Sequence, residues 1–121
     1  MATRNRIPEL SGIEFTGHKS VVEYSKALRE LQRDLSHETD YAGEEIRAVL
    51  TSQRGHPLLF GVDVRLRARK VAKRLHRVSE LNAGAAVEAV KFYQEFRMQF
   101  AEAISPSKRR PNGKAFDFDD E

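Results

Sequence analysis

The stretch Val62–Val78, VDVRLRARKVAKRLHRV, holds seven cations and a single acid, Asp63. Apolar or small residues recur through it every three or four positions, at Val64, Ala68, Val71, Leu75 and Val78. This spacing is typical of an amphipathic helix, and an aspartate just before the first apolar residue suits a helix N-cap. The stretch therefore predicts a helix that packs through one apolar strip and carries its cations elsewhere.

The same spacing continues well beyond Val78. The later members of the strip are Ala85, Ala89, Phe92, Phe96 and Ala103, and the polar residues Asn82 and Gln99 interrupt it. Proline cannot continue a helix, so Pro106 marks its limit. We predict a helix over residues 63–104.

A second helical pattern precedes this one. Ser20 and Glu23 have the spacing of a capping box, which places a helix N-terminus at Ser20. Gly55 and Pro57 are stop signals, so the predicted helix covers residues 20–53. Its expected inward residues are Val21, Tyr24, Leu28, Leu31, Leu35, Ala42 and Val49, with Ile46 compensating where Glu38 and Glu45 interrupt the pattern.

The short connection makes the two helices antiparallel neighbours. In the register that fits best, Tyr24 meets Phe92, and Glu38 lies near Asn82 as a polar layer. The predicted fold is an all-α, antiparallel two-helix hairpin domain over residues 20–104. Residues 1–19 are expected to form an extended arm and residues 105–121 a flexible acidic tail.

Two helices alone bury one narrow strip, which offsets little of the conformational entropy lost on folding. We therefore expect the chain to form a homo-oligomer as a helical bundle, or to dock on a partner. The apolar residues outside the two strips are the candidate contacts for this: Leu58, Leu59, Phe60, Leu81, Tyr93, Phe100 and Ile104.

The composition indicates no enzymatic chemistry. The 121 residues include no cysteine, and no phosphate-binding glycine loop or nucleophile motif is present. The four histidines lack metal-site spacing apart from the pair His76 and Glu80. We predict a non-enzyme with no catalytic residue, no metal and no cofactor. No apolar run is long enough for a membrane span or a signal peptide, so a cytoplasmic location is expected.

The net charge of +3 is small, so only the arrangement of the cations is informative. Arg65, Arg67 and Arg74 flank the strip, where Asp40, Glu44 and Glu45 of the first helix are expected to neutralise them. Four cations point away from the strip and are the candidate site for a polyanion or an acidic partner: Arg69, Lys70, Lys73 and Arg77. No aromatic or amide side chains are interleaved for base readout, so any nucleic-acid contact is nonspecific.

The tail carries two phenylalanines among acids. Phe116, Phe118, Asp119 and Asp120 are a candidate motif for a basic, apolar groove, and a purely solubilising tail is the alternative.

The hairpin plan, with Leu59, Phe60 and Gly61 in the turn, resembles the WXG-type (ESX-like) helical hairpins of specialised secretion systems. That resemblance implies dimeric four-helix bundles, a secretion ATPase as partner and leaderless secretion. The chain has no tryptophan, so Leu59 takes the place of the defining residue. Phe116 with Asp120 takes the place of the family's Tyr-x-x-x-Asp/Glu signal.

Over residues 13–104 the chain is also similar to small actinobacterial plasmid transfer proteins. The shared features are Glu14-Phe15 in the arm, Phe60-Gly61 in the turn, the basic run RLRARKVAKRL and an aromatic end to the second helix. That resemblance implies an accessory role in mobile-element DNA transfer beside an FtsK-like translocase.

Three hypotheses stay open on the sequence. The chain is a structural or interaction module that self-associates through its hairpin, a nonspecific DNA-binding accessory protein, or a virion or filament subunit.

Overall fold

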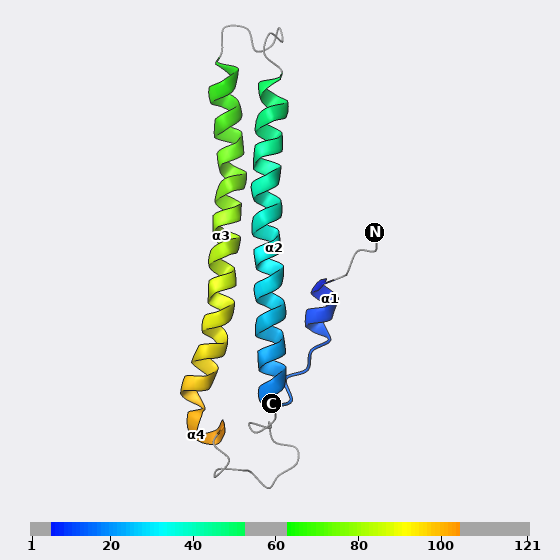
Figure 1. Cartoon of the computed structure of the whole chain (residues 1–121), viewed down its shortest axis with the longest axis vertical. Helices are drawn as coiled ribbons and strands as arrows, with labels where there is room; N and C mark the ends of the chain where they lie inside the picture. Colours follow the sequence, from blue (N-terminus) through cyan, green and yellow to red (C-terminus); the bar gives the residue numbers. More distant parts are fainter. Residues whose placement is uncertain (1–5, 53–62, 105–121) are drawn as a thin grey trace. The chain divides into compact units, whose positions relative to one another are not determined.

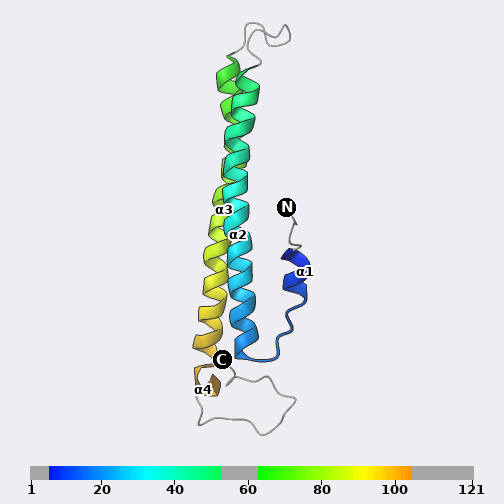
Figure 2. The same ribbon diagram turned by 45° about the vertical axis from the view of Figure 1, so that its right-hand side comes forward.

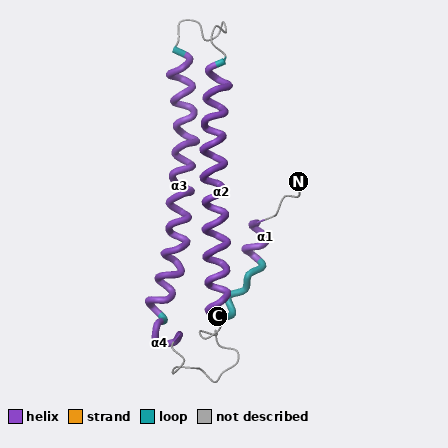
Figure 3. The backbone as a smooth tube through the Cα atoms, viewed as in Figure 1, coloured by secondary structure: helices purple, strands orange, loops and turns teal. Residues whose placement is uncertain are grey.

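The computed structural model describes residues 6–52 and 63–104, all of them helical or in short turns and connections (Figure 1). The helices are α1 (Arg6–Ser11), α2 (His18–Thr51), α3 (Val64–Gln99) and α4 (Ala101–Ile104). No strand is present in these two ranges, as the colouring in Figure 3 shows. The predicted all-α class is confirmed.

The chain divides into two compact units, and each contains one stretch of α2 and one of α3. Unit 1 comprises residues 1–31 and 85–121, and unit 2 comprises residues 32–84. In each unit the two stretches run antiparallel and side by side, as the two views in Figures 1 and 2 agree. The structure therefore confirms the predicted helical hairpin.

The long helices begin and end close to the predicted positions. Asp63 is the N-cap of α3, because its Oδ1 accepts a hydrogen bond of 3.2 Å from the Leu66 amide and its carbonyl accepts one from the Arg67 amide. The α3 helix ends at Gln99, so the helix predicted to run to residue 104 is interrupted at Phe100 before α4.

Ser20 is not the N-cap of α2, which begins two residues earlier at His18. The Ser20 hydroxyl lies in the first turn and accepts hydrogen bonds from the amides of Thr16 and Gly17, at 3.0 and 3.1 Å. Ser20 thus takes the position in the capping box that the sequence assigned to Glu23, and Gly17 is the cap.

The expectation of a wholly extended arm is wrong over Arg6–Ser11, which form α1. Pro8 lies in the first turn of this helix, where a missing amide costs no hydrogen bond. Leu10 gives the short helix an anchor, since its side chain is 8% exposed.

The surface by which α2 and α3 meet is only partly the predicted one. Val21, Val64, Ala68 and Ala89 are buried as expected. However, Leu35, Val49, Val71 and Val78 are between 40% and 51% exposed. Small residues, each one position further along the chain than a predicted strip residue, are buried or, for Ser36, half-buried instead: Ser25, Ser36, Gly43, Ala72, Ser79 and Ala86. We call these six residues, together with the four buried residues above, the inner strip.

Serine hydroxyls form hydrogen bonds between the two helices along the inner strip. In unit 2 the Ser36 hydroxyl lies 2.9 Å from the Ser79 carbonyl oxygen, and the Ser79 hydroxyl lies 2.8 Å from the Ser36 carbonyl oxygen. In unit 1 the Ser25 hydroxyl donates to the Ala89 carbonyl at 2.8 Å. Because these side chains are small, the two helices approach closely enough for a serine hydroxyl of one helix to reach a backbone carbonyl of the other.

The predicted register is confirmed in unit 1, and the predicted polar layer is wrong in unit 2. The rings of Tyr24 and Phe92 lie 6.3 Å apart in an edge-on arrangement. Glu38, by contrast, is exposed rather than placed against Asn82. The polar layer of unit 2 is the Ser36–Ser79 pair, which buries no charge.

Candidate functional site

His76 of α3 bridges two carboxylates of α2 in unit 2. Its Nδ1 lies 2.8 Å from Asp40 Oδ1, and its Nε2 lies 2.9 Å from Glu44 Oε2. The two acids are one helical turn apart, so both side chains extend toward α3 on the same face of α2. Both ring nitrogens donate when the imidazole is protonated, and this arrangement therefore favours the charged form.

The hydrogen bond to Asp40 is the main cause that raises the pKa of His76 above its ordinary value of 6.5. The hydrogen bond to Glu44 and the negative charges of both acids act in the same direction. Partial desolvation of the ring opposes them. The net effect of these contacts is to raise the pKa of His76.

Gly43 gives the imidazole the room to lie flat against α2. A methyl group placed there would be 3.0 Å from Cε1, 3.1 Å from Nε2 and 3.2 Å from Nδ1 of His76. Carbon atoms in ordinary contact are about 3.5–4.0 Å apart, so no other residue fits at this position without displacing the ring.

All four cations predicted to meet a polyanion are exposed, and two of them, Arg69 and Lys73, line a common pocket. Arg69 and Lys73 line a surface pocket of about 340 Å³ in unit 2, with Arg47, Glu44, Ala72 and His76. Arg77 instead pairs with Glu80 on its own helix, at 3.1 Å.

We call the side of unit 2 that bears this pocket the charged flank. It comprises Asp40, Glu44, Arg47, Arg69, Lys73 and His76. The acids expected to neutralise Arg65, Arg67 and Arg74 do not do so: among the described residues, Asp40 pairs with His76, and Glu44 pairs with His76 and Arg47. The charged flank thus carries three permanent cations, two acids and one histidine whose pKa is raised.

The aromatic residues of unit 1 form a cluster around the start of α2. The Tyr93 hydroxyl lies 3.1 Å from His18 Nε2, and the ring of Phe96 packs against those of His18 and Phe100, with centroids 5.8 and 5.9 Å apart. Tyr93 therefore has a hydrogen-bond partner within unit 1. Phe100, at 49% exposed, still presents apolar surface.

The other predicted contact residues fare differently. Leu81 is 58% exposed, as a docking residue would be. Ile104 ends α4, and its side chain is not described. Leu58, Leu59, Phe60 and the tail residues Phe116, Phe118, Asp119 and Asp120 lie outside the described residues.

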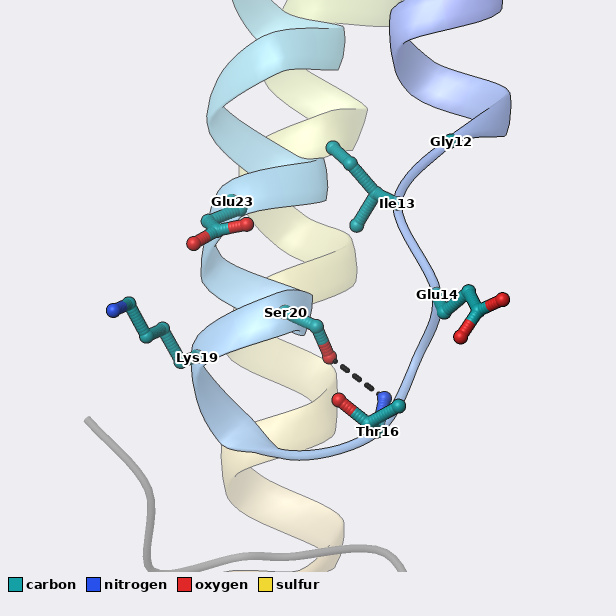
Figure 4. Close-up of a pocket in the computed structure, with 7 residues that line it drawn as sticks. All are labelled: Gly12, Ile13, Glu14, Thr16, Lys19, Ser20 and Glu23. Carbon is teal, nitrogen blue, oxygen red and sulfur yellow. Dashed lines mark hydrogen bonds between the residues drawn. The ribbon is translucent and has the colours of Figure 1, made fainter.

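A second surface pocket lies in unit 1, where the arm meets α2 (Figure 4). It has a volume of about 290 Å³ and is lined by Gly12, Ile13, Glu14, Thr16, Lys19, Ser20 and Glu23. Figure 4 shows the hydrogen bond between Ser20 and the Thr16 amide that holds the connection against the helix. The pocket follows from the cap of α2 and contains two acids and one lysine.

Across residues 6–52 and 63–104, no group of three or more metal-ligating side chains has the geometry to hold a metal ion. None of the described helices is both long and apolar enough to cross a bilayer.

Sequence reasoning missed the His76 bridge because it compared spacings within one helix, where Glu80 was the nearest acid. The signal lay between the helices. A register that pairs Tyr24 with Phe92 also sets His76 level with Asp40. Glu44 follows one turn later.

The fold and surfaces define the class: an all-α helical hairpin joined by small residues, with one charged flank and with large apolar side chains left exposed. Over residues 2–120 the chain matches the model of a family described as plasmid transfer protein TraA-like, and the protein belongs to that family. The plasmid-transfer resemblance is therefore confirmed, while the WXG-type resemblance stays a prediction. Searches of curated proteins and of solved structures found no match.

Proposed function

We propose that this protein is a non-enzymatic accessory protein of plasmid transfer, which self-associates through its hairpin. Membership of the TraA-like family supports the process. The observation that carries the proposal is the exposure of large apolar residues beside the inner strip. Leu35 and Val49 on α2 and Val71 and Val78 on α3 are all at least 40% exposed.

The small residues of the inner strip bury little apolar area, and they do not account for the large apolar residues beside them. Alanine, serine and glycine contribute little apolar area, and burial stabilises by about 25 cal/mol per Å². Leucine and valine in a regular heptad-like spacing would add far more if a partner covered them. The pattern favours assembly with another protein surface.

Light scattering or sedimentation of the purified chain tests the proposal directly. We expect a species of at least twice the 13.8 kDa mass of the chain at micromolar concentration. A folded monomer throughout that range would contradict self-association. Electron microscopy of the same sample distinguishes a closed oligomer from a filament subunit.

Nonspecific contact with the DNA backbone is a second candidate function, supported by the charged flank. Arg47, Arg69 and Lys73 line one pocket there, and His76 adds a further positive charge when protonated. Cations grouped in this way suit phosphate oxygens, and no base-reading side chains accompany them.

Anisotropy of a labelled duplex over a salt series tests this candidate. Affinity should fall steeply with salt, and the Arg69→Glu, Lys73→Glu double variant should flatten the slope by about 0.9 for each phosphate that it no longer neutralises. Lys70→Glu with Arg77→Glu is the matched control, because it changes the charge equally outside the pocket. Equal losses of affinity in both variants would reject the charged flank as the DNA site.

A further inference from the structure

Unit 2 has an apolar side opposite its charged flank. On the inner side of α2, residues 36, 43 and 50 recur every seven positions. Leu35, Ala42 and Val49 each come one residue before one of them. Val71 and Val78 of α3 stand in the same relation to Ala72 and Ser79. We call these five residues the apolar flank.

The hydrogen bonds of His76 show which way each flank faces. Asp40 and His76 come four residues after the inner residues Ser36 and Ala72, and they meet on one side of the helix pair. Four residues forward along a helix turn about 40° in one direction around its axis, and one residue backward turns about 100° in the opposite direction. In an antiparallel pair, equivalent positions share a side. The apolar flank therefore lies across the pair from the charged flank.

The chain's own arm partly covers the equivalent positions in unit 1. Phe15 packs against Tyr24 and Phe92, with ring centroids 5.0 and 6.5 Å away. Phe92 occupies the same heptad position as Val71 and Val78, three and two heptads later. In unit 2 no described residue covers these positions, and Val49 and Val71 stay 51% and 48% exposed.

Charges of opposite sign border the apolar flank on its two helices. Glu38 and Glu45 line its outer edge on α2, and Arg67 and Arg74 line its outer edge on α3. All four are exposed, and none forms an ion pair with another described residue. One edge is thus acidic and the other basic, each with its charges seven residues apart.

We propose that the apolar flank of unit 2 binds the same flank of a second copy, with α2 of each copy lying over α3 of the other. This inference rests on the proposed self-association and specifies its surface. A two-fold axis parallel to the helices produces this arrangement and allows no sliding along them. The acidic edge of each copy then faces the basic edge of its partner.

The register of unit 2 brings the opposite charges to matching heights. The Ser36–Ser79 and Asp40–His76 pairs set Arg74 level with residues 41 and 42 of α2. In the two-fold pair Arg74 falls between Glu38 and Glu45 of the other copy, about 5–6 Å along the axis from each. The alternative pairing, α2 over α2, places acids on acids and arginines on arginines.

The surface has the dimensions of a protein interface. Unit 2 contains twenty residues of α2 (32–51) and twenty-one of α3 (64–84), so each of its helices is about 30 Å long. Two helices packed about 10 Å apart present a face roughly 20 Å wide. A footprint on the order of 600 Å² per copy is comparable with the roughly 800 Å² that each partner contributes to a standard interface.

The first test removes the apolar contact while leaving the hairpin intact. Val71→Asp with Val78→Asp changes side chains that are already exposed in the single chain. We expect the dissociation constant from sedimentation equilibrium to rise at least about 100-fold, at about tenfold for each valine. Leu66→Asp is the matched control, because Leu66 is 45% exposed in the same helix but lies off the flank. Circular dichroism checks that every variant keeps its helix content.

The outcomes separate this inference from the proposed function. If the wild-type chain is a folded monomer, both fail. If the dissociation constant of the double valine variant equals that of wild type, or is no higher than that of Leu66→Asp, self-association stands and the apolar flank is rejected as its surface.

A charge exchange tests the arrangement of the helices. Glu38→Lys with Glu45→Lys should weaken the dimer about tenfold or more in low salt. Adding Arg67→Glu and Arg74→Glu to the same chain should restore it, because α2 of each copy again faces opposite charges on α3 of the other. If the fourfold variant stays as weak as the twofold variant, or associates no better in low salt than in high salt, the arrangement of α2 over α3 is overturned.

Discussion

Replacing Gly43 with alanine sets a gain in helix propensity against a clash with the ring of His76. Glycine inside a helix is about 0.5–1 kcal/mol less favourable than alanine. At Gly84 of α3, an added Cβ atom would have no described side chain or neighbouring segment within 4 Å. Gly84→Ala should therefore stabilise the protein by about 0.5–1 kcal/mol, and it measures the propensity gain free of any clash.

At Gly43 the same gain is opposed. The new methyl group would lie 3.0–3.2 Å from three atoms of the His76 ring, while ordinary contact needs about 3.5 Å or more. Two hydrogen bonds of 2.8 and 2.9 Å hold the ring in place, so it moves away only by lengthening them. Inserting a methyl group into a packed site typically costs about 1–3 kcal/mol. We expect Gly43→Ala to be about 1–3 kcal/mol less stable than Gly84→Ala.

Urea unfolding followed by circular dichroism measures this difference. The comparison is made at one protein concentration where the variants share the same oligomeric state, because association adds to apparent stability. In a His76→Ala background the clash is absent, so Gly43→Ala should there stabilise by the same amount as Gly84→Ala. If Gly43→Ala already matches Gly84→Ala with His76 present, the close packing of the ring on α2 is refuted.

Three further predictions concern His76, the paired serines and the cap of α3. Because the pKa of His76 is raised on folding, its ion pairs stabilise the protein fully below about pH 6.5 and lose that effect as the pH rises through the folded pKa; urea unfolding over a pH series should show this slope, and His76→Gln should remove it. Ser79→Ala should cost about 1 kcal/mol, and adding Ser36→Ala should cost less than the single changes summed, as a double-mutant cycle would show. Asp63→Ala should cost about 0.5–2 kcal/mol because α3 loses its cap, seen as a lower urea midpoint with an unchanged slope.

The helices and their register could be predicted from the sequence because the signals for them are local or repeat many times. Asp63 is a cap in the sequence and in the structure. The pairing of Tyr24 with Phe92 came from matching two long patterns, and an error of one turn would have misaligned every later pair. Residues 6–11 were missed because a six-residue helix has no room for a periodic pattern.

The rotation of each helix could not be predicted as well, because two strips compete one residue apart. Large apolar side chains mark one strip, with Leu35 and Val71 among them. The adjacent strip, with Ser36 and Ala72, holds small and partly polar residues that hydropathy ranks lower. Small residues allow helices to approach closely and to exchange serine hydrogen bonds, and this close contact decides which strip faces the neighbouring helix.

The difference between the predicted and the observed strip bears on function. Apolar periodicity alone does not distinguish residues that pack the two helices of one chain together from residues that another surface covers. Ser36 and Ser79 join the helices within one chain, whereas the leucines and valines beside them remain exposed there. A periodic row of large apolar residues indicates that something covers the row, but it does not say whether the cover belongs to the same chain. In unit 1 the arm residue Phe15 supplies part of that cover. In unit 2 the acidic and basic edges of the apolar flank are complementary to each other, which is the property a surface needs to bind its own copy.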